Sequence, residues 1–221
     1  MTRPGKGRFH IGLVKYYLLL LILLLGINSV PGQKVVRKVL LLPHITHIQI
    51  DAGSLAEVEL KTKPGADLSL RAIIEGEYRK DLTIEVVEEG NTLRVTAALQ
   101  PFFKIPNDKL SAHKVIAISL YIEVPEDKFV SLYGTSTQVS AWGIYKELEV
   151  VLNDGQCILK NLKDKVNVTT QSGNIDLETA SGTFNVNSKY GTVKQDYIPK
   201  GNSNYYLMSN SGNITIKAVE R

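Results

Sequence analysis

The 221-residue chain has a single cysteine, Cys157, and therefore cannot form a disulfide within itself. Its stability must come from packing and not from covalent cross-links. Because Cys157 falls in a column of apolar residues, we expect a buried thiol that behaves as a small hydrophobic side chain, with a reactive or intermolecular cysteine as the alternative. No convincing amphipathic helical pattern occurs over residues 35–125, which argues against a helical fold.

Motifs of catalysis and of metal binding are missing as well. The sequence has no Gly-Xaa-Ser-Xaa-Gly elbow, no phosphate-binding loop and no dinucleotide fingerprint. The histidines do not cluster into a zinc ligand set; they are His10, His44, His47 and His113. Calcium needs several oxygen ligands at an organised spacing, and the turn over 153–155 lacks them. We therefore expect no metal, no cofactor and no enzymatic activity.

Acidic residues are absent from the first 32 positions, where four of the 26 basic residues lie. The remaining 22 basic residues balance the 22 acidic ones, so the net charge of +4 belongs to this segment alone. Because the rest of the chain is formally neutral, its net charge gives no reason to expect nucleic-acid binding.

The basic N-terminal segment continues into an apolar run over 16–27 and a breaker region over 28–32, which is the order of a secretory signal peptide. The apolar run is shorter than the roughly 20 residues that cross a bilayer as a permanent helix. We expect a signal peptide over residues 1–32, cleaved after Gly32. The alternative is an uncleaved anchor, which would be the only membrane contact. Both interpretations predict an exported protein of the periplasm, the cell surface or the extracellular space.

The most regular feature of the chain is a ladder of glycines in its C-terminal half, spaced by 21, 18, 18 and 21 residues. The ladder consists of Gly134, Gly155, Gly173, Gly191 and Gly212. The residue five positions before each glycine is apolar, and strand-like alternation surrounds each of them. Recurrence at a short period is the signature of a solenoid, in which each repeat buries its apolar residues only against its neighbours.

Strand patterns also fill the region before the ladder. Aliphatic runs separated by turn formers include a hairpin over 82–97 and a long alternating strand over 115–124, whereas 100–112 is typical of an exposed loop. We predict an all-β protein in which antiparallel strands over 33–125 lead into a short right-handed parallel β-helix, or β-solenoid, over 126–221. The two regions are expected to form one continuous domain.

Four short segments between Val115 and Val219 place glycine in a polar turn or lead into the repeats. They are Ser172-Gly173-Asn174-Ile175, Ser211-Gly212-Asn213-Ile214, Ala180-Ser181-Gly182-Thr183-Phe184 and Tyr121-Ile122-Glu123-Val124-Pro125. In these segments the chain resembles bacterial putative adhesin domains, including the head GIN group. The resemblance implies a secreted or surface-associated β-solenoid with no established catalytic residues.

The residue that follows each ladder glycine is polar and uncharged. Such a column is either a hydrogen-bonded turn ladder or a strip that binds carbohydrate. Our hypothesis is that the strip and nearby tyrosines contact sugar rings or a partner surface. The candidate ligand-binding residues are Asn174, Thr192, Asn213, Tyr190, Tyr197, Tyr205 and Tyr206.

Carboxylates on the outer face are candidate catalytic groups. If the repeats stack in sequence order, oppositely charged residues lie side by side. The expected pairs are Lys160 with Glu178, Asp176 with Lys194, and Asp196 with Lys217. A paired carboxylate is poorly placed to act as a general acid, because a nearby cation favours its ionised form.

These observations predict an exported, non-catalytic, adhesin-like binding or interaction module of the bacterial cell envelope. Its partner would be a cell-surface glycan or an envelope protein. The alternatives are a carbohydrate-active β-helix enzyme that uses Asp176 and Glu178, or a periplasmic sensing or regulatory domain that binds another envelope protein. Because the strand over 213–219 is expected to end the stack without a cap, we also predict a homo-oligomer through that end.

Overall fold

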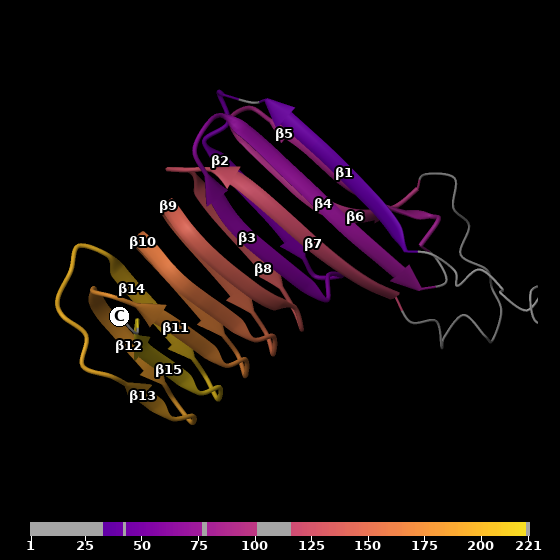
Figure 1. Ribbon diagram of the computed structural model, residues 1–221. Coiled ribbons are helices and arrows are strands. Elements are labelled where there is room, and N and C mark those ends of the chain that lie inside the picture. Colours follow the sequence, from indigo (N-terminus) through magenta and orange to yellow (C-terminus); the bar gives the residue numbers. More distant parts are fainter. Residues whose placement is uncertain (1–32, 42, 77–78, 101–115, 220–221) are drawn as a thin grey trace, which may run out of the picture. The chain divides into compact units, whose positions relative to one another are not determined.

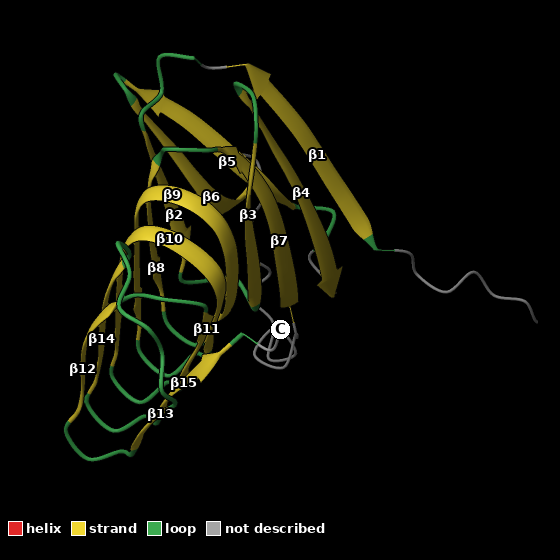
Figure 2. Ribbon diagram, turned by 60° about the vertical axis from the view of Figure 1, so that its left-hand side comes forward, coloured by secondary structure: helices red, strands yellow, loops and turns green. Residues whose placement is uncertain are grey.

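The computed structural model describes residues 33–41, 43–76, 79–100 and 116–219. All of them belong to one compact unit, Gln33–Arg221. The unit is built from strands, and no helix occurs in these four segments (Figure 2). Within them no helix is therefore long and apolar enough to cross a membrane. The predicted all-β class is confirmed, whereas the predicted signal peptide and nearly all of the predicted loop over 100–112 lie outside the described residues.

The strands form one mixed sheet of 15 strands with two branches. The first, here called the long branch, has the order β1-β4-β7-β3-β9-β10-β11-β15-β13 (Figure 1). Its strands are β1 (Lys34–Leu41), β4 (Asp67–Gly76), β7 (Ile116–Pro125), β3 (Glu57–Lys63), β9 (Gln138–Leu152), β10 (Cys157–Thr170), β11 (Ile175–Thr179), β15 (Ile214–Ala218) and β13 (Val193–Gln195).

The second, or short, branch shares β9 and β10 with the first and has the order β5-β6-β2-β8-β9-β10-β14-β12. Its other strands are β5 (Leu82–Glu89), β6 (Thr92–Leu99), β2 (His47–Ala52), β8 (Phe129–Gly134), β14 (Asn204–Ser209) and β12 (Thr183–Ser188). The shared strands are long and curve from one branch into the other (Figure 2). Their first halves pair in the long branch and their second halves pair in the short branch.

The pairing direction explains what was right and wrong about the N-terminal strands. The predicted hairpin is present as the antiparallel pair β5–β6, and β1–β4 and β4–β7 are antiparallel too. However, β2 pairs in parallel with β6 and β8, and β3 pairs in parallel with β7 and β9. The prediction of an antiparallel N-terminal region is therefore only partly correct. The consecutive strands β2 and β3 enter opposite branches and therefore do not form a hairpin.

One hydrophobic core receives the inward-facing residues of both branches. Alternate positions of each strand point inward, as the period of two requires. Cys157, Ile175 and Ile214 are adjacent in register, and all three are fully buried. The prediction of a buried Cys157 is confirmed. Burial raises the pKa of its thiol, and the charge of Asp176 acts in the same direction, so the reactive thiolate is disfavoured.

The glycine ladder lies at a corner of the strand layers, where backbones approach closely. A Cβ atom on Gly173 would lie 1.9 Å from the carbonyl oxygen of Gly155, so only glycine fits. Register pairs Cys157 with Val139, which places Thr137 opposite Gly155. Thr137, and not the predicted Gly134, therefore occupies the first equivalent corner.

The order of the last layers differs from the prediction. Strand β14 lies between β10 and β12, and β15 lies between β11 and β13. The strand over 213–219 is thus internal, and β12 and β13 form the edge instead (Figure 1). Lys160 lies opposite Glu178 as predicted, but Asp176 lies opposite Thr215 and not opposite Lys194. In the same ladder Lys217 is the neighbour of Glu178.

Candidate functional site

The predicted polar strip forms a hydrogen-bonded turn ladder. The side-chain oxygen of Asn174 accepts a 2.9 Å hydrogen bond from the backbone N–H of Asn213. The side-chain oxygen of Asn213 accepts bonds from the backbone N–H and the hydroxyl of Thr192, at 2.9 and 2.8 Å. These amide oxygens are therefore engaged in joining successive layers, although all three side chains are exposed. The turn-ladder interpretation accounts for this geometry.

The four predicted tyrosines divide into one core residue and three surface residues. Tyr205 is fully buried, donates a 2.7 Å hydrogen bond to the carbonyl oxygen of Leu162 and stacks on Phe184. It cannot reach a ligand at the surface, so we remove it from the candidate site. The exposed fractions of the other three side chains are 71% for Tyr190, 91% for Tyr197 and 41% for Tyr206. They come from three different segments: the turn after β12, the connection after β13, and β14.

The outer face of the long branch carries a hollow of about 360 Å³ that sequence reasoning did not identify. It lies where β1, β4, β7, β3 and β9 run side by side (Figure 1). Among the lining residues that face outward, three are basic and two are acidic, so the hollow carries a net positive charge. The residues that matter most to its chemistry are Arg37, Arg71, Tyr121, Glu59, Lys61 and Trp142.

The register of five strands brings these residues together in two neighbouring rows. In the first row Arg37 lies opposite Arg71, Arg71 opposite Tyr121, and Tyr121 opposite Glu59. In the second row Lys61 has Glu123 on one side and Trp142 on the other. The strands alternate, so each residue in a row points to the outer face while its neighbours in sequence point to the core.

The two arginines are the unusual feature of the first row. Like charges directly opposite each other on paired strands are destabilising. The guanidinium carbon of Arg71 lies 4.4 Å from the centre of the Tyr121 ring, a cation–π contact that holds this side chain against the sheet. Within residues 33–219, leaving out the undescribed gaps, no carboxylate lies within 4.0 Å of either guanidinium.

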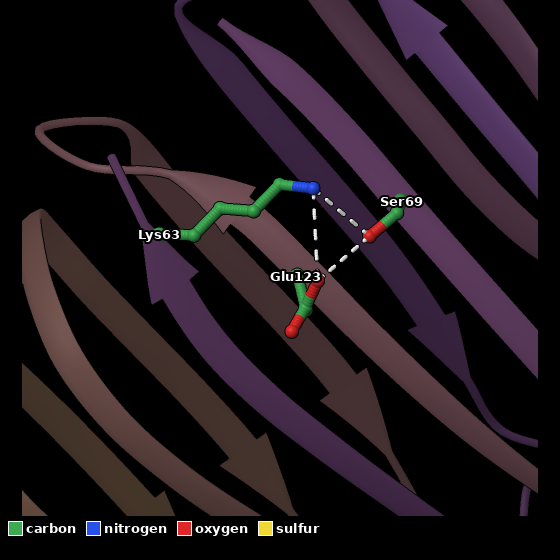
Figure 3. A network of polar contacts seen from close by, with 3 residues as sticks. All are labelled: Lys63, Ser69 and Glu123. Carbon is green, nitrogen blue, oxygen red and sulfur yellow. Dashed lines mark hydrogen bonds and ion pairs between the residues drawn. The ribbon is translucent and has the colours of Figure 1, made fainter. Parts of the chain in front are cut away.

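The acidic residue of the second row is engaged by its own neighbours, as Figure 3 shows. The hydroxyl of Ser69 donates a 3.0 Å hydrogen bond to Oε2 of Glu123. The ammonium group of Lys63 donates to the Ser69 hydroxyl at 3.2 Å and lies 3.6 Å from the same carboxylate oxygen. Glu123 is therefore compensated locally and does not neutralise the arginine pair.

Trp142 borders the hollow because β9 bends immediately after it. The next residue, Gly143, has a φ of +119°, and the backbone N–H of Ile144 donates a 2.8 Å hydrogen bond to the Thr62 hydroxyl. A Cβ atom on Gly143 would lie 2.0 Å from that hydroxyl oxygen. Glycine is thus required at the bend by conformation and by space. Trp142 is the only tryptophan of the chain, which makes it a natural fluorescent reporter of this site.

The carboxylates of the enzymatic alternative border a second hollow, of about 330 Å³, farther along the same face. Glu178 lies between Lys160 and Lys217 in register. Asp176 accepts a 2.8 Å hydrogen bond from the side-chain amide of Gln156. Both carboxylates thus lie next to cationic or amide side chains. In the described segments, no group of three metal-ligating side chains is placed to hold a metal ion.

The chain shares its fold with a putative cell adhesion protein from Clostridium sporogenes, with 17% identity and a TM-score of 0.62 over 85% of this chain and 100% of that chain. Similarity is also found to a putative adhesin from Bacteroides fragilis, with 11% identity and a TM-score of 0.33 over 86% and 99% of the two chains. No family model and no curated protein matches the sequence. The expected resemblance to bacterial putative adhesins is confirmed at the level of the fold.

Proposed function

We propose that this protein is an exported, non-catalytic, adhesin-like binding module of the bacterial cell envelope. In this proposal its parallel strand layers form a short right-handed β-solenoid, and the outer face of the long branch binds a cell-surface glycan. The hollow that contains Arg71, Tyr121 and Trp142 is the observation that carries the proposal. Aromatic and arginine side chains are enriched where proteins bind partners, and a stiff sheet presents them in a fixed array.

Two further observations support this proposal. The fold is shared with a Clostridium sporogenes protein that carries the name of a cell adhesion protein. The volume of the hollow falls within the range of ligand sites in proteins, roughly 300–1,000 Å³. The exposed Tyr190, Tyr197 and Tyr206, with the turn ladder that includes Asn174, Thr192 and Asn213, remain a second proposed contact surface.

The proposal predicts saturable glycan binding without turnover. We would screen the purified protein against a glycan array, then titrate each bound glycan while recording Trp142 fluorescence, with calorimetry as an independent measurement. A Tyr121→Ala variant should weaken binding, whereas a variant with alanine at Tyr190, Tyr197 and Tyr206 tests the second surface.

The outcomes separate the three classes of function. Release of shorter sugars, lost in Asp176→Asn or Glu178→Gln, would overturn the non-catalytic proposal in favour of the enzyme. Selective capture of one envelope protein with no glycan bound would favour the sensing domain. Loss of binding only in the triple tyrosine variant would move the site away from the hollow.

A homodimer through the edge strands is a separate prediction. Among the described residues, β12 pairs only with β14 and β13 only with β15, so each leaves one side of its backbone open. The inward-facing Phe184 and Val186 are only partly buried, and Val193 is 44% exposed. Open edges with apolar surface favour pairing with a second copy. We expect light scattering to show a concentration-dependent dimer, which Val193→Lys should weaken roughly tenfold. A monomer at all concentrations would contradict this prediction.

A further inference from the structure

The outer face offers one site whose charge is not balanced by the residues around it. Arg37 and Arg71 are direct partners in the antiparallel pair β1–β4, and both side chains are exposed on the outer face. Side chains at such positions have Cβ atoms about 4.5–5.5 Å apart, so the two guanidinium groups can reach the same oxyanion. An oxyanion between them would replace a repulsion by two charge-assisted interactions.

The acidic residues of the hollow do not take that role. Glu123 is held by Ser69 and Lys63. Glu59 lies on β3, and Tyr121 of β7 stands between it and Arg71 in the row. The Tyr121 ring also supports Arg71 from below, which restricts the guanidinium without consuming its hydrogen-bond donors.

The aromatic side chains indicate what the oxyanion is attached to. Tyr121 and Trp142 both border the hollow, on β7 and β9, with β3 between these strands. Four strand spacings separate β1 from β9, which amounts to roughly 19 Å across the face. The site is therefore longer than a single small anion needs. Its floor has the arginine pair at one end and Trp142, beside Lys61, at the other. An extended chain of sugars with acidic groups matches both features.

We propose that this hollow binds an acidic polysaccharide, with the Arg37–Arg71 pair holding an oxyanion of one sugar and Tyr121 and Trp142 contacting the neighbouring rings. This inference rests on the proposed glycan-binding function and adds the ligand class. Carboxylate, sulfate and phosphate groups on sugars share the required oxyanion chemistry, and the experiment below distinguishes them.

The test compares oligogalacturonate with its methyl ester, which has the same sugar backbone without the negative charge. Trp142 fluorescence and calorimetry would give the dissociation constants at low salt and at 0.15 M salt. We expect the ester to bind roughly tenfold more weakly, and added salt to weaken only the acid. A sulfated polysaccharide and a sugar phosphodiester polymer, titrated in parallel, identify the preferred oxyanion.

Variants then assign the effect to the arginine pair. Arg37→Gln and Arg71→Gln should each weaken binding of the preferred anionic polymer roughly tenfold. The matched control is Arg94→Gln, which removes the same charge from β6 in the short branch and should leave binding unchanged. Because Arg37 lies opposite a like charge, Arg37→Gln should unfold at the same or a higher urea concentration than the unaltered protein.

The results separate this inference from the proposed function. If no anionic polymer binds more tightly than the uncharged ester, or if anionic binding survives both arginine variants, the oxyanion site is overturned but glycan binding stays in place. Absence of binding to every charged and neutral glycan overturns both. Preference for one charged polymer, lost in Arg37→Gln and Arg71→Gln but kept in Arg94→Gln, supports the site and names its oxyanion.

Discussion

Replacing Gly173 by alanine is expected to lower the free energy of unfolding by about 4 kcal/mol. An added Cβ would lie 1.9 Å from the carbonyl oxygen of Gly155 and 2.9 Å from its carbon. Both atoms belong to the backbone of the neighbouring layer, so no side-chain rotation can relieve the contact. Strands in a sheet are about 4.8 Å apart, and local separation of the layers would break the hydrogen bonds on both sides of the corner.

Urea unfolding followed by circular dichroism would measure this effect, with Gly65→Ala as the matched control. Gly65 has a φ of +109° but no atom within 4 Å of an added Cβ. Its substitution adds only backbone strain and should cost about 1–2 kcal/mol. The backbone of Gly173 is not in the left-handed region, so its requirement for glycine is one of space alone. Equal losses in the two variants would show that layer contact is not what Gly173 provides.

The same contacts record the order of the layers. A Cβ atom added to Gly155 would lie 2.0 Å from the carbonyl oxygen of Thr137. A Cβ atom added to Gly212 would lie 2.0 Å from the carbonyl oxygen of Gly173, and one added to Gly191 would lie 2.2 Å from that of Gly212. The stack therefore passes from Gly173 to Gly212 and only then to Gly191. In the last two layers the order of the strands in space differs from their order along the chain.

Much of the strand architecture could be predicted, because it depends on local alternation. The hairpin of β5 and β6, the strand β7, and the column of Cys157, Ile175 and Ile214 follow from which neighbouring residues are apolar. Such patterns state which side of a strand is buried. They do not state which strand lies beside it, because every repeat presents a compatible column.

The layer order could have been inferred only by comparing how apolar the inward residues are. Strand β15 directs Ile214 and Ile216 inward, and both are buried. Strand β13 has Val193 and Gln195 at the equivalent positions, and both are exposed. A polar inward residue is costly in a core and harmless at an edge, which explains why β15 is internal and β13 is not.

The hollow that contains Arg71, Tyr121 and Trp142 could not be predicted from the sequence for a different reason. Its residues come from strands whose spatial order is β1, β4, β7, β3 and β9, with no two neighbours consecutive in sequence. Arg37 belongs to a region without glycine repeats, Trp142 lies between the first two ladder glycines, and neither has a local motif. Only the cross-strand register places arginines, an aromatic ring and a lysine on one face.

Replacing Tyr205 by alanine should lower the free energy of unfolding by about 3 kcal/mol, whereas replacing Tyr206 should change it by less than about 0.5 kcal/mol. The two tyrosines are adjacent in β14 and point to opposite sides. Tyr205 is fully buried and stacks on Phe184, with ring centres 5.2 Å apart. Its hydroxyl lies 2.7 Å from the carbonyl oxygen of Leu162 and 2.9 Å from the hydroxyl of Thr179.

The Tyr205→Phe variant separates the two contributions to this loss. It keeps the ring and leaves the Leu162 carbonyl without its donor, which should cost about 1–3 kcal/mol. Because β14 is the described partner of β12, hydrogen exchange should show that Tyr205→Ala also reduces protection in β12. Equal stability of Tyr205→Ala and Tyr206→Ala would mean that β14 is not held inside the stack. If Tyr205→Ala reduced protection only in β14, the edge strand β12 would have to pair with a strand other than β14. The hydrogen-exchange measurement therefore tests the order of the layers.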